Sequence, residues 1–454
     1  MPKALFAPQA LLPDGWAEQV LIETDARGMI TRVTRGAEAP AGAEHCHGPV
    51  LPGMPNLHSH AFQRAMAGLA EVALNPEDSF WTWRDLMYRL VGRLTPDQVQ
   101  AIARYLYIDM LKGGYTAVAE FHYLHHDQNG RPYADPSEMS QRVLAAAEGT
   151  GIAITLLPVM YAHGGFGGKD PSDGQRRFIH TTDQYLKLQE KLAAFCAKPG
   201  RRLGFCFHSL RAVTLDEIKA VMASTDDDRP VHVHIAEQQK EVEDCLAWSR
   251  RRPIQWLYDN VDVDDRWCLI HATHAEPDEV AAIVKSRAIA GICPTTEANL
   301  GDGLFPAVSF VDQGGRLGIG SDSHVSLSVV EELRWLEYGQ RLKHERRNRL
   351  HGPNTKHVAG YLYRAALDGG AQALGQKMGA IAPGHRTDLV VLDGQHPLLA
   401  HVGGDDILGR WLFAGLNRMV KDVMVGGQWV VQDGRHADEI EAGRAFAAAV
   451  KAAI

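Results

Sequence analysis

The sequence lacks any apolar run near the roughly 18 consecutive residues that a membrane-spanning helix requires. It also lacks a recognisable signal peptide, because residues 1–19 contain one lysine, two acidic residues and an apolar stretch interrupted by proline. These two absences exclude a membrane protein and predict a location in the cytoplasm.

A surplus of positive charge is missing as well. The 47 lysines and arginines are outnumbered by 55 aspartates and glutamates, which gives a formal net charge of −8. No overall field therefore attracts this chain to nucleic acid. The six cysteines include no C-x-x-C pair, and several lie in apolar, strand-like segments. We expect buried, reduced thiols rather than a disulfide framework, which agrees with a cytoplasmic location.

What the chain does contain is ordinary for a folded globular protein, with 45% hydrophobic and 22% charged residues. Short β-like segments occupy both ends, before residue 50 and after residue 380, and an alanine-rich stretch at 439–454 is typical of a helix. We predict that residues 1–49 and 381–454 together form one small β-sandwich domain with a C-terminal helix.

Residues 50–380 have a different texture, in which apolar strand candidates alternate with amphipathic helix patterns. Eight such units are what a (β/α)8 barrel requires. We therefore predict an α/β fold with a (β/α)8 TIM barrel over residues 50–380. The strand candidates end at His58, Phe121, Met160, Phe207, Ile235, His271, Pro294 and Ser321.

Three H-x-H pairs occur among the 22 histidines, although chance alone gives about one pair in a chain of this length. One pair lies in a glycine-flanked loop and is a weak candidate. His58 and His60 close the first barrel strand, and residues two apart on a strand face the same side. In the fifth strand, His234 lies nearer the functional end, whereas His232 is one layer deeper and favours a hydrogen-bonded core position.

The strand ends of the predicted barrel place His58, His60, His234 and Asp322 at one mouth, where they would share a centre. Imidazole nitrogens with one carboxylate oxygen suit a divalent transition metal, zinc first and Fe²⁺ as the alternative. Such a metal makes hydroxide available near neutral pH, which indicates a hydrolase.

Two further side chains reach the same mouth. His271 ends the sixth strand, and Glu237 follows the fifth strand by two residues. Beside a metal-activated water, a carboxylate is a natural proton shuttle, although Glu237 alone is equally explained as a helix-capping partner.

Three segments of this pattern resemble the amidohydrolase superfamily: N-L-H-S-H at 56–60, H-I-A-E at 234–237 and G-S-D-S-H at 320–324. Binuclear members carry a carboxylated lysine at the end of strand four, and residues 205–211 contain no lysine, so we expect a single metal. Longer stretches are similar to the formimidoylglutamate deiminase family of histidine degradation. They are M-P-N-L-H-S-H-A-F-Q-R-A-M-A-G from 54, F-H-Y-L-H-H from 121, H-S-L-R-A-V from 208 and C-P-T-T-E-A-N-L-G-D-G from 293.

The resemblance implies a reaction in which N-formimidoyl-L-glutamate is hydrolysed to N-formyl-L-glutamate and ammonia. It implies that the four residues His58, His60, His234 and Asp322 bind the metal, and that Glu237, His271 and Asp322 are catalytic. It further implies that the substrate is held by Gln63, Arg84, Tyr123, His208 and Arg211.

The chemistry of the substrate agrees with two of these assignments. Two carboxylates on a small molecule are well paired by the planar fork of arginine, which Arg84 and Arg211 supply. We expect Arg84 in a long loop after the first strand. Either arginine alone is more often a surface ion-pair member, and core packing explains Tyr123 or Gln63 equally well.

The sequence leaves two alternative functions open. A related deaminase could act on a purine, pterin or nucleoside, whose flat ring is held by stacking and amide contacts. An inactive, metal-containing binding protein is a different class. A cytidine-deaminase site is excluded because its P-C-x-x-C signature is missing. We expect a homodimer only because dimers are the commonest oligomers.

Overall fold

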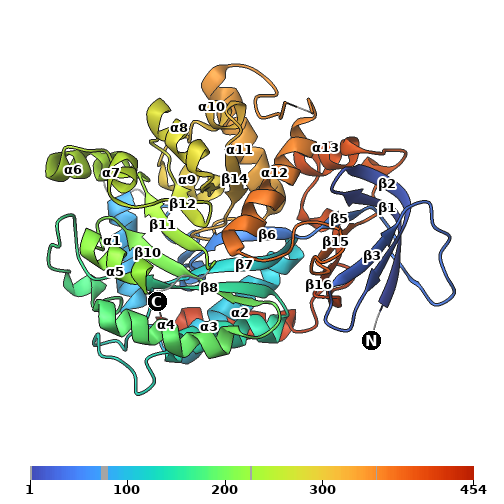
Figure 1. Cartoon of the computed structure of the whole chain (residues 1–454). Helices are drawn as coiled ribbons and strands as arrows, with labels where there is room; N and C mark the ends of the chain where they lie inside the picture. Colours follow the sequence, from blue (N-terminus) through green and yellow to red (C-terminus); the bar gives the residue numbers. More distant parts are fainter. Residues whose placement is uncertain (1–2, 73–79, 225–227, 354, 454) are drawn as a thin grey trace.

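The computed structural model describes residues 3–72, 80–224, 228–353 and 355–453. Two sheets organise these residues (Figure 1). One is a barrel of parallel strands surrounded by helices, and the other is a mixed sheet whose strands come from both ends of the chain. Among the described residues, no helix combines the length and the apolar character needed to cross a membrane.

The barrel confirms the predicted α/β architecture. Within the described ranges its eight parallel strands follow the chain order, each hydrogen-bonded to the next, and a bridge between Ser59 and Asp322 brings the last strand against the first. A short strand, β9 (Arg201–Leu203), pairs with the third strand, off the path of the barrel. The barrel strands are β6 (Met54–Ser59), β7 (Tyr115–His122), β8 (Ala153–Met160), β10 (Phe205–Ser209), β11 (Val231–Ile235), β12 (Trp267–His271), β13 (Ile289–Ile292) and β14 (Arg316–Ile319).

Several helices begin at capping residues. The clearest case is α2 (Pro96–Lys112), where the Thr95 hydroxyl accepts from the Gln98 N–H and the Gln98 side chain accepts from the Thr95 N–H. The other helices around the barrel are α1 (Phe80–Val91), α3 (Glu138–Thr150), α4 (Thr182–Cys196), α5 (Leu215–Ala223), α6 (Gln239–Ser249), α7 (Pro253–Asn260), α8 (Pro277–Ser286), α9 (Pro294–Leu300), α10 (Ala307–Asp312), α11 (Val329–His344) and α12 (Val358–Leu374).

Glycine allows α12 to pack directly on the seam between the first and last barrel strands. A Cβ on Gly369 would lie 2.0 Å from the carbonyl oxygen of Leu317 in β14, and one on Gly370 would lie 2.5 Å from Pro55 in β6. A larger residue at 369 would clash with the Leu317 backbone, and one at 370 would clash with the Pro55 ring. The two glycines therefore let α12 lie directly against both strands.

The mixed sheet runs in the order β17-β16-β15-β5-β1-β2-β3, with β4 beside β1, and confirms that both chain ends build one β structure. The sequence does not reveal β1, because Pro8 interrupts it. The strand continues through Pro8, and the pairing with β2 omits Pro8 and Gln19, which has a φ of +50°. The strands are β1 (Lys3–Leu12), β2 (Gly15–Thr24), β3 (Ile30–Thr34), β4 (Glu44–His45), β5 (Val50–Pro52), β15 (Leu389–Leu392), β16 (Val420–Val425) and β17 (Gln428–Val431).

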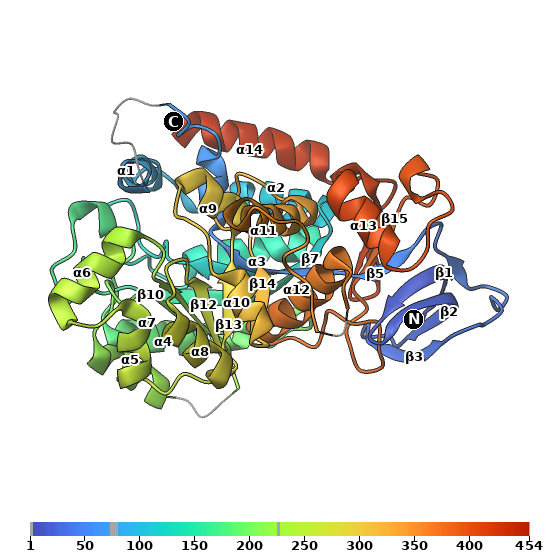
Figure 2. The ribbon, with the colours of Figure 1, turned by 90° about the horizontal axis from the view of Figure 1, so that it is seen from above.

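Two helices of the C-terminal region complete the chain. The first is α13 (Asp405–Ala414), and the second, α14 (Glu439–Ala453), occupies the alanine-rich stretch. Figure 2 shows α14 alongside α2 of the barrel, where Lys112 Nζ lies 2.6 Å from the Glu439 carboxylate. The division of the chain into domains at residues 50 and 380 stays a prediction.

Candidate metal centre and substrate pocket

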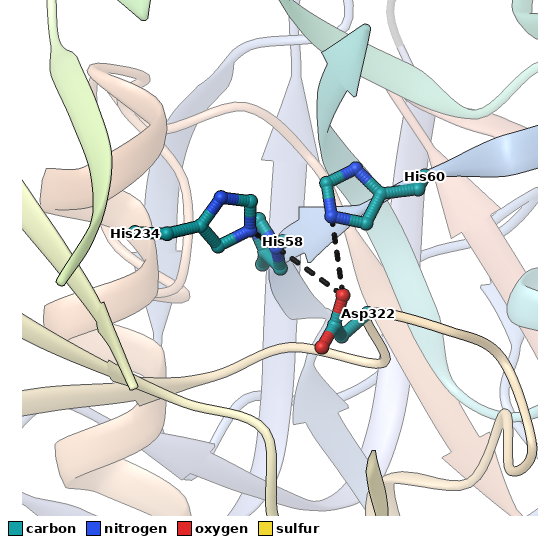
Figure 3. Close-up of side chains that lie close together, drawn as sticks. All are labelled: His58, His60, His234 and Asp322. Carbon is teal, nitrogen blue, oxygen red and sulfur yellow. Dashed lines mark hydrogen bonds and ion pairs between the residues drawn. The ribbon is translucent and has the colours of Figure 1, made fainter. Parts of the chain in front are cut away.

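The barrel brings the four predicted ligands together at the C-terminal ends of its strands (Figure 3). His58 and His60 lie at the end of β6, His234 in β11 and Asp322 just after β14. The Nε2 atoms of His58 and His60 are 3.4 and 3.2 Å from Asp322 Oδ1. The Nε2 atoms of His234 and His58 are 3.0 Å apart. All four side chains are buried.

Backbone carbonyls set the orientation of two of these imidazoles. His60 donates its Nδ1–H to the Phe121 carbonyl at 2.9 Å, and His234 donates its Nδ1–H to the His208 carbonyl at 2.9 Å. A neutral imidazole that donates from Nδ1 presents a lone pair at Nε2. The Nε2 lone pair of His60 therefore faces Asp322, and that of His234 faces His58. This set of donor atoms fits one divalent transition metal.

Burial also prepares the ligands for a metal. It lowers the pKa of His58 to about 3, helped by the nearby His60, and it lowers the pKa of His234 well below its usual value. Burial opposes ionisation of Asp322, yet contacts with His58 and His60 hold the pKa of that carboxyl well below its usual range. Neutral imidazoles and an ionised carboxylate are the protonation states that bind metal.

The backbone is strained where these functional side chains leave the strands. The φ angle is +69° at His271, +46° at Asp322 and +49° at Ala236, the residue before Glu237. Non-glycine residues in such conformations cost about 1–3 kcal/mol each and occur where the surroundings hold them.

The two predicted proton-transfer residues stand beside the quartet. His271 Nε2 is 3.6 Å from Asp322 Oδ2 and 3.8 Å from Glu237 Oε1. Burial raises the pKa of Glu237 to about 7, against the opposing charges of His271 and Arg211. Burial acts against the charge of His271, but Glu237 and other acidic neighbours raise its pKa to about 10. A carboxyl group that titrates near neutral pH suits proton transfer.

Two acidic residues of this site were missed by the sequence analysis. His271 Nδ1 lies 3.2 Å from Glu297 Oε1, and the buried Asp302 accepts a hydrogen bond from the Gln238 side chain. Burial is the main cause that raises the pKa of Asp302 to about 9, and the negative charge of Glu237 adds to it. Both acids lie in the segment from Cys293 that resembles the deiminase family, but no spacing rule assigns them a role.

A pocket opens onto these groups and has about 570 Å³ of space outside protein atoms, including its mouth. The lining contains all five residues predicted to hold substrate, namely Gln63, Arg84, Tyr123, His208 and Arg211. Aromatic and apolar side chains that were not predicted complete the wall: Trp83, Met87, Tyr88, Tyr161, Phe178 and Leu300.

The structure corrects the local environment of Arg84. This residue lies in α1 and not in a long loop, and its guanidinium is 5.5 Å from the centre of the Tyr88 ring. The loop prediction was wrong because residues 80–83, three aromatic residues and a threonine, show no spacing of apolar residues typical of a helix. A helix holds the guanidinium more firmly than a loop would.

The remaining polar groups of the wall have defined charge states. Burial opposes the charge of Arg211, but Glu241 and Glu237 raise the pKa of its guanidinium. Burial and the nearby Arg211 lower the pKa of His208 well below its usual value. Gln63 donates its amide to the Tyr123 hydroxyl at 2.9 Å. The pocket therefore combines permanent positive charge with neutral hydrogen-bonding groups.

His232 behaves as a core residue, as the sequence predicted. It is fully buried, and its Nε2 lies 2.7 Å from the Ala373 carbonyl oxygen.

Comparison with known proteins gives consistent matches over the whole chain. The sequence model of the amidohydrolase family matches residues 50–430, and the model described as the N-terminal domain of formimidoylglutamate deiminase HutF matches residues 2–47. A formimidoylglutamate deiminase from Pseudomonas aeruginosa is 64% identical over 98% of both chains. A 5-methylthioadenosine/S-adenosylhomocysteine deaminase from Natronomonas pharaonis is 27% identical over 90% of this chain and 87% of its own. The crystal structure of an amidohydrolase from Brucella melitensis aligns with a TM-score of 0.93, at 48% identity over 99% of both chains.

Proposed function

The chain belongs to the amidohydrolase family and, within it, to the formimidoylglutamate deiminases, and on this basis we propose that it hydrolyses N-formimidoyl-L-glutamate. Water adds to the formimidoyl carbon, the bond from that carbon to the terminal nitrogen breaks, and N-formyl-L-glutamate and ammonia are released. The observation that carries the proposal is the joint presence of the metal quartet, Arg84 and Arg211 around one pocket.

Within this proposal, His58, His60, His234 and Asp322 hold one divalent metal, which we infer to be zinc, with Fe²⁺ as the alternative. When bound, the metal supplies Lewis acidity, which lowers the pKa of water and stabilises negative charge. Every other step falls to side chains of the protein.

The proton transfers are assigned to the acidic groups and the histidine beside the quartet. Asp322 takes the proton of the attacking water, and His271, which is positively charged at neutral pH and whose Nε2 lies 3.6 Å from Asp322 Oδ2, assists this transfer. Glu237, with its pKa near 7, carries a proton to the nitrogen that departs as ammonia. His271 also stabilises the charge that develops on the oxygen atom that water adds to the formimidoyl carbon.

The substrate-binding roles follow from charge and hydrogen-bonding capacity. Arg84 and Arg211 pair with the two carboxylates of the substrate, because a guanidinium fork matches a carboxylate in geometry and charge. Gln63, Tyr123 and His208 supply neutral hydrogen bonds along the same wall. This arrangement favours a small, doubly charged, linear molecule.

The finer physiological assignments are also part of the proposal. We infer that the enzyme acts in the degradation of histidine, which yields this substrate, and that it works in the cytoplasm. We further infer a homodimer, on the frequency of such assemblies alone.

Parallel assays of ammonia release from N-formimidoyl-L-glutamate, guanine and adenosine test the proposal. We expect release from the first compound, loss of that release after treatment with a chelator, and recovery when zinc is added back. Faster release from guanine or adenosine, or activity that is insensitive to metal removal, would refute it.

A purine or nucleoside deaminase remains the second candidate because the chain is 27% identical to a relative of that kind. The substitution Arg211→Met separates the two. For a dicarboxylate substrate, the loss of one charge-assisted contact lowers kcat/KM by roughly 10–100-fold. A change of less than about threefold favours the nucleoside alternative.

A further inference from the structure

Glu297 lies behind His271, on the side of the imidazole that faces away from Asp322. Its Oε1 is 3.2 Å from His271 Nδ1, while the opposite nitrogen, Nε2, faces Asp322 at 3.6 Å. We propose that Glu297 is a positioning residue for the deimination reaction. It keeps a proton on His271 Nδ1 and holds the ring so that Nε2 faces the reacting groups. The effect on deimination rests on the proposed function, but the hydrogen bond between Glu297 and His271 does not.

The surroundings of His271 show why such a partner is needed. Its ring lies parallel to that of His234, at a centroid distance of 5.6 Å and an angle of 9° between the planes. This packing fixes the plane of the ring but does not distinguish it from the ring turned by 180°, in which Nδ1 exchanges places with Cδ2 and Nε2 with Cε1. Only a polar partner on one side selects one of the two orientations.

Burial makes this selection strong. His271 is 1% exposed and Glu297 is 5% exposed, so water does not compete for either group. A hydrogen bond between a buried carboxylate and an imidazole is charge-assisted and is stronger than one between neutral groups. The turned ring would leave the Glu297 oxygen facing a carbon atom of His271, so this buried pair would lose its hydrogen bond.

Glu297 also has a purely structural contact. The same Oε1 accepts the backbone N–H of Cys293 at 2.8 Å, at the beginning of α9. Removal of the side chain therefore has two effects, one on the start of the helix and one on His271. The two effects must be separated by experiment.

Three variants and one control make this separation. Glu297→Ala removes both contacts, whereas Glu297→Gln keeps an oxygen for Cys293 and loses the charge. His271→Asn provides the background in which positioning of the imidazole no longer matters. The control is Glu279→Gln, because Glu279 is also buried and accepts the backbone N–H of Glu276 at the start of α8 and that of Gln255, but contacts Arg252 and not His271.

The kinetic result expected is a fall in kcat of roughly 10–100-fold for Glu297→Ala, with KM changed less than threefold and the metal content unchanged. The kcat of Glu297→Gln should lie between that of Glu297→Ala and that of the unmodified chain. In the His271→Asn background, Glu297→Ala should lower kcat no further, since the two residues act as a unit. Glu279→Gln should lower thermal stability and leave kcat unchanged.

A readout without substrate keeps the two proposals distinguishable. In ¹⁵N-histidine NMR of the zinc-loaded protein, His271 should show a protonated Nδ1, and this signature should change in Glu297→Ala and persist in Glu279→Gln. If the enzyme releases no ammonia from N-formimidoyl-L-glutamate, this signature still tests the link. An unchanged His271 signature in Glu297→Ala, or an equal loss of kcat in the His271→Asn background, would overturn the inference.

Discussion

Two ionisable side chains of the pocket, Arg211 and His208, are each held in one charge state by their surroundings. Arg211 remains charged because carboxylates face it, and His208 is neutral because it is buried near that guanidinium. Glu237 differs from both, since its pKa of about 7 allows it to exist in either form at neutral pH. At this scale, Glu237 is the carboxyl group whose pKa suits it to deliver a proton to the departing nitrogen.

Glu237→Gln removes that proton carrier and leaves the metal ligands untouched. We expect the variant to bind one metal per chain and to lose turnover by roughly 10²–10⁴-fold, the usual contribution of general acid–base catalysis. Metal analysis and ammonia release measured on the same preparation check both parts. Turnover near that of the unmodified protein would refute the assigned role.

Asp302 allows a prediction of how stability depends on pH. The pKa of Asp302 is about 9 in the folded chain, whereas its ordinary value is 3.8. Between these two pH values, the folded state therefore keeps a proton that the unfolded state has lost. Stability therefore decreases as pH rises from about 4 to about 9. Asparagine cannot ionise and still offers an oxygen to Gln238. We expect Asp302→Asn to raise the unfolding temperature by a few degrees at pH 8 and by less at pH 5.

Calorimetry of Asp302→Asn and of the unmodified chain at both pH values provides the measurement. An equal shift at pH 5 and pH 8 would show that the carboxyl group is ionised in the folded protein, contrary to the assignment.

The elements of the barrel follow closely from local sequence, while some elements outside it do not. The predicted strand ends at His58, His271 and Ser321 lie at or within two residues of the observed ends, because buried parallel strands are continuous apolar runs bounded by polar residues. In contrast, Pro8 hides β1 in the sequence, and α1 occupies a segment for which the sequence predicts a loop. The main partner of β1 is the next strand, β2, so the proline and not the distance to a partner hides this strand.

The seam between α12 and the barrel permits a test at the level of packing. Gly369→Ala places a Cβ against a backbone carbonyl that cannot move aside, so we expect a loss of roughly 1–3 kcal/mol in the free energy of unfolding. Gly149→Ala is the matched control, since a Cβ on this residue of α3 meets no atom within 4 Å. The control should be neutral or stabilising by up to about 1 kcal/mol. Similar urea unfolding curves for both variants would contradict the packing described for α12.

At the scale of the whole molecule, the fold gathers residues that lie more than 260 positions apart in the sequence, from His58 to Asp322. The quartet was predictable because a closed barrel brings all strand ends to one face, and three histidines and an aspartate gathered there form a typical metal-binding set. Glu297 and Asp302 were not predictable in this way. They lie in and after α9, and only the folded structure shows that Glu297 reaches His271 and that Asp302 reaches Gln238.

The central claim is that one divalent metal, held by this quartet, is required for deimination. The most direct test is to strip the protein of metal, titrate it with zinc and measure ammonia release from N-formimidoyl-L-glutamate at each addition. The account predicts no activity without metal, a linear rise and a plateau at one zinc per chain. Full activity in the stripped protein, or a rise that continues to two zinc ions per chain, would contradict it.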